Sequence, residues 1–306
     1  MVDFLKKCRK HWQLFLFIAP AVIYILIFSY YPMFGVQIAF KDFTPGKGIW
    51  GSPWVGFKHF AKFFKSYQFS RVVINTLRLS FYSLFVGTPL AIFMSLAINV
   101  VRNTHFKKIV QTITYMPHFI STVVLVGMII QTFNPIMGMY GNIYRLLGNT
   151  GYPKDILTQS SVFPHLYVWS GMWQELGWST IIYLAALSNV DLELHEAAQI
   201  EGANRFKRII YIDFPVLLPT ASILLILRAG SIMNVGFEKV FLMQNSANLV
   251  LSEVISTYVY KVGMTGGGTQ FSYASAIGLF NSVINCIILV VVNFFSRRVE
   301  EGASLF

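Results

Sequence analysis

The sequence predicts an all-α integral membrane protein with six transmembrane helices. Of its 306 residues, 55% are hydrophobic and only 12% are charged, whereas a soluble domain has about 25% charged residues. The hydrophobic residues gather in runs of about 20 residues or more, the length that a helix needs to cross a bilayer. These runs are continuous rather than alternating, so they do not fit the strands of an outer-membrane barrel.

Six apolar segments account for most of the chain. They are predicted to span the membrane near residues 14–34, 72–100, 109–133, 162–187, 215–235 and 273–295. Together they form one transmembrane domain over residues 12–296, with short tails at 1–11 and 297–306. Trp12 and the pair Tyr30-Tyr31 fit aromatic anchors at the two membrane interfaces.

The first three spans are bounded by prolines and polar loops. Pro20 and Pro32 lie near the ends of the first span, where disruption of a helix costs least. A polar loop with a short helix over 57–64 leads to the second span, whose single charge is Arg78. The third span is expected to end at Asn134-Pro135.

The last three spans each carry or border a charge. Glu175 lies inside the fourth span, and Arg228 lies inside the fifth, which is expected to begin at Pro215. A loop with a helix over 249–260 follows. Charged residues within spans are costly and are functional candidates by default.

The distribution of Lys and Arg predicts the orientation. These residues are densest in the N-terminal tail, in the turn at 102–108 and at the C-terminal end. Positive charges next to spans favour the cytoplasmic side, so both termini and the polar segment 191–213 are expected in the cytoplasm of a bacterial cell. The net charge of +11 is explained by anionic lipid headgroups, and no nucleic-acid partner is expected.

The polar segment at residues 191–213 interrupts the pattern of spans. It begins with acidic residues and ends with basic ones, which suits the dipole of a helix. Gly202 permits a sharp turn, so a helix-turn-helix on the cytoplasmic face is predicted. The segment is either an amphipathic connector on the membrane or a docking surface for a partner, and its small residues favour docking.

This segment resembles the EAA motif of permease subunits of ABC importers. The matching residues are Glu196-Ala197-Ala198, Gly202-Ala203, Ile212, Pro215 and Pro219. Two departures are mild, because Glu201 stands where Asp is usual and Asp213-Phe214 replaces a common Thr-Leu. The resemblance extends to the carbohydrate branch and its polysaccharide-related LplB-like group through 40–42, 54–56, 75–76, 115–121, 236–238, 257–260 and 272–273.

The resemblance implies a type I importer in which this chain is one of two permease subunits, the second being a different protein. Two cytoplasmic ATP-binding subunits would grip a coupling helix, and an extracellular solute-binding lipoprotein would deliver a saccharide. The residues carried over as ATPase-coupling residues are Glu196, Ala197, Ala198, Gly202, Ala203 and Phe206. We call residues 191–213 the coupling region.

The chain itself is not expected to be an enzyme. Its nearest approach to a phosphate-binding loop, 45–48, lacks the required glycine spacing and hydroxyl. ATP and Mg would therefore be used by the partner ATPase, and no cofactor is expected on this chain. The six histidines are scattered, so no metal site is predicted.

The substrate pathway is expected to involve charged, aromatic and amide side chains. Carbohydrates stack on aromatic faces and form hydrogen bonds through their hydroxyls, so a carboxylate among tryptophans suits them. The candidates are Glu175, Trp169, Trp173, Trp178, Arg228 and Asn234. The alternative is a packing cluster in which Glu175 pairs with Arg78 or Arg228. For Asn234, helix packing is the favoured interpretation, and His118 is expected to be structural.

Two other functions remain open from the residues alone. An ion-coupled secondary transporter would show inverted repeats, and no clear repeat is present. An integral membrane glycan or lipid enzyme would need a cluster of catalytic side chains, and none is evident. Neither alternative explains the small residues of the coupling region.

Overall fold

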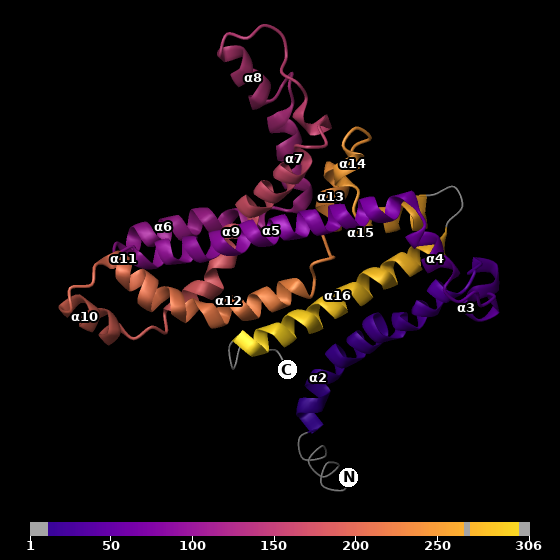
Figure 1. The fold of residues 1–306 in the computed structure, drawn as a ribbon, viewed down its shortest axis with the longest axis horizontal. Helices are drawn as coiled ribbons and strands as arrows, with labels where there is room; N and C mark the ends of the chain where they lie inside the picture. Colours follow the sequence, from indigo (N-terminus) through magenta and orange to yellow (C-terminus); the bar gives the residue numbers. More distant parts are fainter. Residues whose placement is uncertain (1–11, 266–269, 300–306) are drawn as a thin grey trace. The chain divides into compact units, whose positions relative to one another are not determined.

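Helices form almost all of the regular structure in the computed structural model, which describes residues 12–265 and 270–299. Within these residues the extended structure is limited to one isolated bridge between Lys41 and Trp54. The chain forms two units (Figure 1). The first contains the chain up to Lys65 together with Val259–Leu279, and the second contains Ser66–Tyr258 and the chain from Phe280 onward.

The first unit begins with the predicted first span. The helix α2 (Trp12–Ile25) continues through a π-helical turn, η1 (Leu26–Tyr30), into the 3₁₀ helix η2 (Tyr31–Phe40). The loop after it holds η3 (Pro45–Lys47), α3 (Gly48–Gly51) and α4 (Lys58–Phe64). The α4 helix confirms the short helix expected over 57–64. Later in the chain, α15 (Ile255–Tyr260) leads through η7 (Lys261–Thr265) toward α16 (Phe271–Val299).

The second unit is built on α5 (Tyr67–Val100) and α9 (Phe163–Leu187), which pack along one another. The helices α6 (Thr104–Tyr115) and α12 (Phe214–Ala229) also pack against α9, as Figure 1 shows. Gly177 permits the close approach of α9 to α6, because a Cβ atom there would lie 2.1 Å from the carbonyl oxygen of Thr114. Leu217 and Tyr183 lie in the buried core that joins α12 to α9.

Shorter helices complete the second unit. They are α7 (Thr122–Phe133), α8 (Met139–Leu146), α10 (Leu192–Ile200), α11 (Arg205–Arg208), α13 (Phe237–Met243) and α14 (Leu249–Ser252), with η4 (Met116–Phe119), η5 (Ile156–Thr158) and η6 (Ile209–Asp213). The expected helix over 249–260 is broken between α14 and α15. The break lets the buried Glu253 carboxylate pair with Arg71 of α5.

The helix over the predicted third span, 109–133, is sharply bent. The segment Thr104–Phe119 and the segment Thr122–Phe133 meet at an angle of 98°. Pro117 lacks the amide hydrogen that a continuous helix would use, and Ser121 caps the new helix by accepting a hydrogen bond from the amide of Val124 at 3.4 Å. This chemistry ends one helix and starts another.

The helix at the predicted fifth span, 215–235, has different limits. The helix runs from Arg205 to Ala229, because Asn204 caps its first turn and the π-helical η6 carries the chain into α12. Pro215 lies in the first turn of α12, where the missing amide hydrogen is tolerated. The helix ends at Ala229, and residues 230–236 form a loop.

The described residues contain four helices long and apolar enough to cross a membrane, or five if the bent pair counts as one span. The four are Trp12–Phe40, Tyr67–Val100, Arg205–Ala229 and Phe271–Phe294. The first two cover the predicted spans 14–34 and 72–100, whereas Arg205–Ala229 and Phe271–Phe294 begin before the predicted spans 215–235 and 273–295 and end before them. The α9 helix has 25 residues, enough length to cross, but it is not among the four.

The predicted tails lie mostly outside the described residues. This holds for 1–11 and for 300–306, whereas α16 continues through 297–299, which were predicted to be tail.

Candidate functional site

A polar cleft in the second unit brings together three of the predicted pathway residues. It has a volume of about 290 Å³ and contains Glu175, Arg228 and Asn234 in its wall. The other lining residues are Leu79, Ser80, Ser83, Leu84, Tyr167, Met172, Ser179, Ser231, Ile232, Val235 and Gly236. Hydroxyl, amide, carboxylate and guanidinium groups therefore line one hollow.

Three helices and one loop build this cleft. The α5 helix contributes Ser80 and Ser83, α9 contributes Glu175, and α12 contributes Arg228 near its last turn. The 230–236 loop is held to α5 because the Ser80 hydroxyl donates a hydrogen bond to the carbonyl of Ile232. The cleft therefore exists only because α12 stops at Ala229 and the chain turns across α5.

Glu175 has a histidine partner that the sequence did not reveal. His118 Nδ1 lies 3.0 Å from Glu175 Oε2, and the His118 ring stacks on Trp178 with centroids 4.3 Å apart. Among the described ion pairs, Glu175 is joined to His118 and to neither arginine, so the proposed pairing with Arg78 or Arg228 was wrong. The only signal in the sequence was that His118 follows Pro117, where a bend turns its ring toward α9.

Lys239 supplies a buried positive charge beside this cluster. It is 9% exposed, and its Nζ donates a hydrogen bond to the carbonyl of Tyr167 at 2.9 Å. Burial lowers the pKa of Lys239 to about 8, and the negative charge of Glu175 opposes that shift. Lysine is rarely buried unless it is paired, and nothing in the sequence of α13 indicated that Lys239 would be buried.

The three predicted tryptophans do not line the cleft. Trp169, Trp173 and Trp178 are each about half exposed on α9. Trp169 donates a hydrogen bond from its indole nitrogen to the hydroxyl of Tyr82 at 3.0 Å. Their exposed faces leave both stacking on a ligand and packing against another protein open to them.

The other two cleft residues differ in how firmly they are held. Arg228 Nη1 lies 3.5 Å from Thr88 Oγ1, a long contact that leaves most of the guanidinium free to bind a ligand. The Asn234 carbonyl accepts hydrogen bonds from Asn281 at 2.9 Å and Asn285 at 3.2 Å. This network favours a packing role for Asn234 in the wall of the cleft.

The coupling region forms a second candidate site, on α10 and the turn that follows it. Asp191 caps α10 by accepting a hydrogen bond from the amide of Glu193 at 3.0 Å. Gly202 has a φ of 81°, in the left-handed region that glycine adopts at little cost. Its turn is closed by a hydrogen bond from the amide of Ala203 to the carbonyl of Ala198 at 2.8 Å.

The exposed side of this region presents both charge and apolar surface. Glu196, Ala197 and Gly202 are exposed, whereas Ala198 and Ala203 are half-buried in the turn. Ile200 is 89% exposed and Phe206 is 69% exposed. Apolar side chains of this size, so exposed on a polar element, are typical of a surface that a partner covers.

Comparison with known proteins identifies the family. Residues 87–301 match the model of the binding-protein-dependent transport system inner membrane component. The chain belongs to this family. The chain is therefore a translocation component of a transport system rather than an enzyme, and it is a multi-pass membrane protein.

Individual relatives match this inner membrane component along almost its whole length. Protein LplB of Bacillus subtilis is 40% identical, with 96% of this chain and 91% of the relative covered. The polygalacturonan/rhamnogalacturonan transport system permease protein YteP of the same organism is 39% identical, with 97% and 91% covered.

A solved structure has the same fold. A chain from the crystal structure of a bacterial ABC transporter involved in the import of the acidic polysaccharide alginate is 38% identical, with a TM-score of 0.88. The comparison covers 98% of this chain and all of that one. A related crystal structure holds the alginate transporter in complex with a periplasmic protein bound to alginate pentasaccharide, and its matching chain has a TM-score of 0.87.

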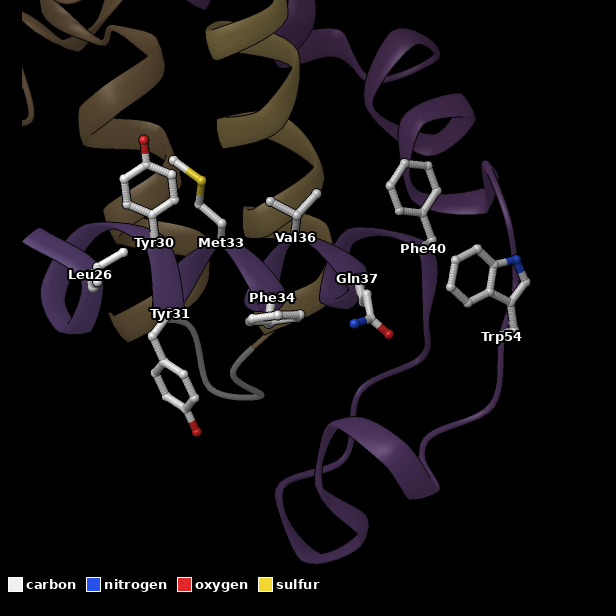
Figure 2. Close-up of a pocket in the computed structure, with 9 residues that line it drawn as sticks. All are labelled: Leu26, Tyr30, Tyr31, Met33, Phe34, Val36, Gln37, Phe40 and Trp54. Atoms are coloured by element: carbon white, nitrogen blue, oxygen red, sulfur yellow. The ribbon is translucent and has the colours of Figure 1, made fainter. Parts of the chain in front are cut away.

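The inner membrane component also has an apolar groove in its first unit. The groove has a volume of about 640 Å³, and Figure 2 shows Phe40 and Trp54 beside one another at one end of it. Their rings stack with centroids 5.7 Å apart. Its side-chain polar groups are the tyrosine hydroxyls, the amide of Gln37 and the indole N–H of Trp54, so it suits lipid or protein better than a saccharide.

The part of the chain that the structure describes shows no metal site. No group of three His, Cys, Asp or Glu side chains within residues 12–265 and 270–299 has the arrangement needed to hold a metal ion.

Proposed function

We propose that this chain is the permease subunit through which an ATP-driven importer moves a saccharide derived from an acidic polysaccharide. The observation that carries the proposal is the polar cleft, where hydroxyl and amide groups stand beside Arg228 and Glu175. Hydroxyl and amide groups bind sugar hydroxyls, and a guanidinium binds a sugar carboxylate through paired hydrogen bonds. The names of two relatives, which refer to polygalacturonan and alginate, support the same substrate class.

The proposal includes four partners. Two cytoplasmic ATP-binding subunits would bind the exposed face of the coupling region, and they would use ATP and Mg. A second permease subunit, a different protein, would cover the exposed tryptophans of α9 and complete the pathway. An extracellular solute-binding lipoprotein would deliver the saccharide, as the complex of a related transporter with its periplasmic protein suggests.

The proposed orientation places both termini and α10 in the cytoplasm. It is supported by the density of Lys and Arg next to the predicted spans and by the exposed coupling region. Under this orientation Glu196, Ala197, Ala198, Gly202, Ala203 and Phe206 would contact the ATPase.

Reconstitution tests the proposal directly. The chain is assembled in liposomes with its second permease and ATP-binding subunits, and uptake of galacturonate oligosaccharides or alginate pentasaccharide is measured with the solute-binding protein. Gly202→Asp should abolish ATP-driven uptake, because the carboxylate and the strained turn would both disturb the ATPase contact. Gly148→Asp is a matched control, since Gly148 is also exposed at positive φ but lies in another loop.

Two results would contradict the proposal. Undiminished ATP-driven uptake by Gly202→Asp would overturn the role of the coupling region. Uptake that needs an ion gradient and no ATPase would identify a secondary transporter instead.

A further inference from the structure

We propose that Asp213 pins the coupling helix α10 to the transmembrane helices through His195 and Asn99, and so transmits ATPase motion to the polar cleft. This inference rests on the proposed function. It assigns a positioning role to three residues that lie outside the exposed surface of the coupling region.

One carboxylate oxygen joins three elements of the second unit. Asp213 is the last residue of η6 and is 3% exposed. Its Oδ1 lies 3.3 Å from Nε2 of His195 on α10. The Nδ2 of Asn99, near the end of α5, donates a hydrogen bond to the same oxygen at 3.5 Å. We call these three side chains the Asp213 pin.

The pin is the main side-chain attachment of α10 to the rest of the unit. The α10 helix does not pack along any other helix within the described chain, and Figure 1 shows it projecting from the end where α11 begins. Only two of its residues, His195 and Ala198, are half-buried, and the others are exposed. Ala198 contributes the carbonyl that closes the Gly202 turn, so His195 is left to fix the helix to the body.

Burial makes the Asp213 carboxylate dependent on these partners. A buried charge is costly unless it is paired and accepts hydrogen bonds. Arg208, one turn earlier in the same continuous helix, also interacts with it electrostatically. Although the contacts with His195 and Asn99 are long, they lie where water is largely excluded, so removing either one leaves the carboxylate less compensated.

Two of the helices that meet at the pin, α5 and the helix that continues from η6 into α12, also line the cleft. Ser80 and Ser83 come from α5, and Arg228 comes from α12, which continues from η6. Between the pin and the cleft, α5, α9 and α12 share a buried core that includes Ala91, Tyr183 and Leu217. Close-packed cores shift as units rather than deform continuously. A displacement of α10 at His195 is therefore carried along both helices instead of being absorbed by the loops.

Asp213 is also a departure of this chain from the motif that the coupling region resembles, where Thr is common. A threonine hydroxyl has no negative charge and a shorter reach, so it would not hold a histidine in the same way. The pin is therefore a feature of this chain's own residues rather than of the motif.

The test uses the reconstituted complex and matched variants. His195→Leu removes the contact, whereas His195→Gln keeps a nitrogen donor near the position of Nε2. Asp213→Asn removes the charge, and Asn99→Leu removes only the α5 contact. His105→Leu is the control, because it removes an exposed histidine in the first turn of α6. Transported oligogalacturonate or alginate pentasaccharide per ATP hydrolysed is measured together with co-purification of all subunits.

We expect His195→Leu and Asp213→Asn to lower transport per ATP about tenfold, the loss typical of one hydrogen bond to a charged group. Basal ATP hydrolysis and subunit assembly should stay unchanged, because the exposed docking surface is intact. Asn99→Leu should have a smaller effect, and His195→Gln and His105→Leu should behave like the unmodified complex.

A second measurement does not depend on the saccharide. A spin label at Ser83→Cys in a background with Cys8→Ser and Cys286→Ser reports on the cleft when ATP and Mg are added. The response of this label should be lost in Asp213→Asn and retained in His195→Gln.

Two outcomes overturn the pin. The first is an unchanged label response in His195→Leu and Asp213→Asn. The second is a parallel loss of transport and ATP hydrolysis, which would show a merely structural role. The unmodified complex could take up neither saccharide while the label still responds to ATP. That result would contradict the proposed substrate class, and the label response of the variants would then be the test of the Asp213 pin.

Discussion

The exposed face of the coupling region and the polar cleft hold their side chains in opposite ways. On the exposed face, backbone caps and the Gly202 turn fix the shape, and within the described residues Glu196 and Phe206 have no partner from another helix. In the cleft, Glu175 and Asn234 are each bonded to a side chain from a distant segment. The first arrangement suits a rigid surface that another subunit covers, and the second suits a site that changes when helices move.

The largest expected effect is on the affinity of the coupling region for the ATP-binding subunits. Phe206→Ala removes an exposed aromatic side chain of the kind that dominates interfaces, and we expect a loss of about 2 kcal/mol, or roughly thirtyfold in affinity for the ATP-binding subunits. Titration of purified subunits in detergent measures it. Phe85→Ala, at a similarly exposed phenylalanine of α5, should leave that affinity unchanged. An equal loss in both variants would argue against a specific docking surface.

The next largest expected effect is on saccharide uptake through the polar cleft. Arg228→Met keeps the length of the side chain but removes the guanidinium, and we expect saccharide uptake to fall about tenfold through the loss of charged hydrogen bonds. Affinity for the ATPase should not change. Arg78→Met is the control, because Arg78 is exposed on α5 and does not line the cleft. If the two variants transport equally well, Arg228 is not a pathway residue.

A smaller expected effect tests the contact between His118 and Glu175. His118→Phe keeps an aromatic ring for stacking on Trp178 but removes the nitrogen that contacts Glu175, and we expect uptake to fall about fivefold, as for one modest hydrogen bond. His118→Asn retains a donor close to Nδ1 and should keep most of the activity. Initial uptake rates over a range of saccharide concentrations distinguish the variants. Faster uptake by His118→Phe than by His118→Asn would show that His118 acts by stacking on Trp178 and not through its contact with Glu175.

The smallest effect concerns pH. The pKa of Lys239 is about 8 in the folded protein and 10.5 without burial, so the unfolded chain binds more protons between these values. Stability should therefore rise as pH increases through about 8, because the buried charge is lost. We expect the midpoint of thermal unfolding in detergent to rise by about 3 °C between about pH 7 and about pH 9. Lys239→Met should remove that dependence, and a rise of the same size in this variant would show that other groups cause it.

The local structure of the coupling region was predictable from the sequence because it depends on side chains close to it in the chain. Asp191 and Gly202 act on backbone within a few residues of themselves, so their order along the chain was enough to predict a helix followed by a sharp turn. The same local logic failed where two signals competed. Pro215 indicated a helix start, but the Asn204 cap and the π-helical turn of η6 began the helix ten residues earlier.

The cleft was only partly predictable. Charges inside apolar runs identified Glu175 and Arg228, because such residues are costly and must have a role. Their partners were not predictable, since His118 lies 57 residues from Glu175 and reaches it only through the 98° bend between α6 and α7. The sequence places the tryptophans near Glu175 along α9, and in the described structure Trp178 stacks on the ring of His118, which contacts Glu175.

The sequence by itself determined that this protein is a helical membrane component and where an exposed polar segment, 191–213, interrupts the apolar ones. It predicted six spans, and the described residues contain four helices long and apolar enough to cross, or five if the bent pair counts as one. Composition and local capping decide those properties, and both act over a few residues. Only the tertiary structure decided that Glu175 pairs with His118, that Lys239 is buried beside them, and that Asp213 meets His195 and Asn99. Those contacts depend on how helices distant in sequence pack, and no local pattern encodes the direction in which a packed side chain points.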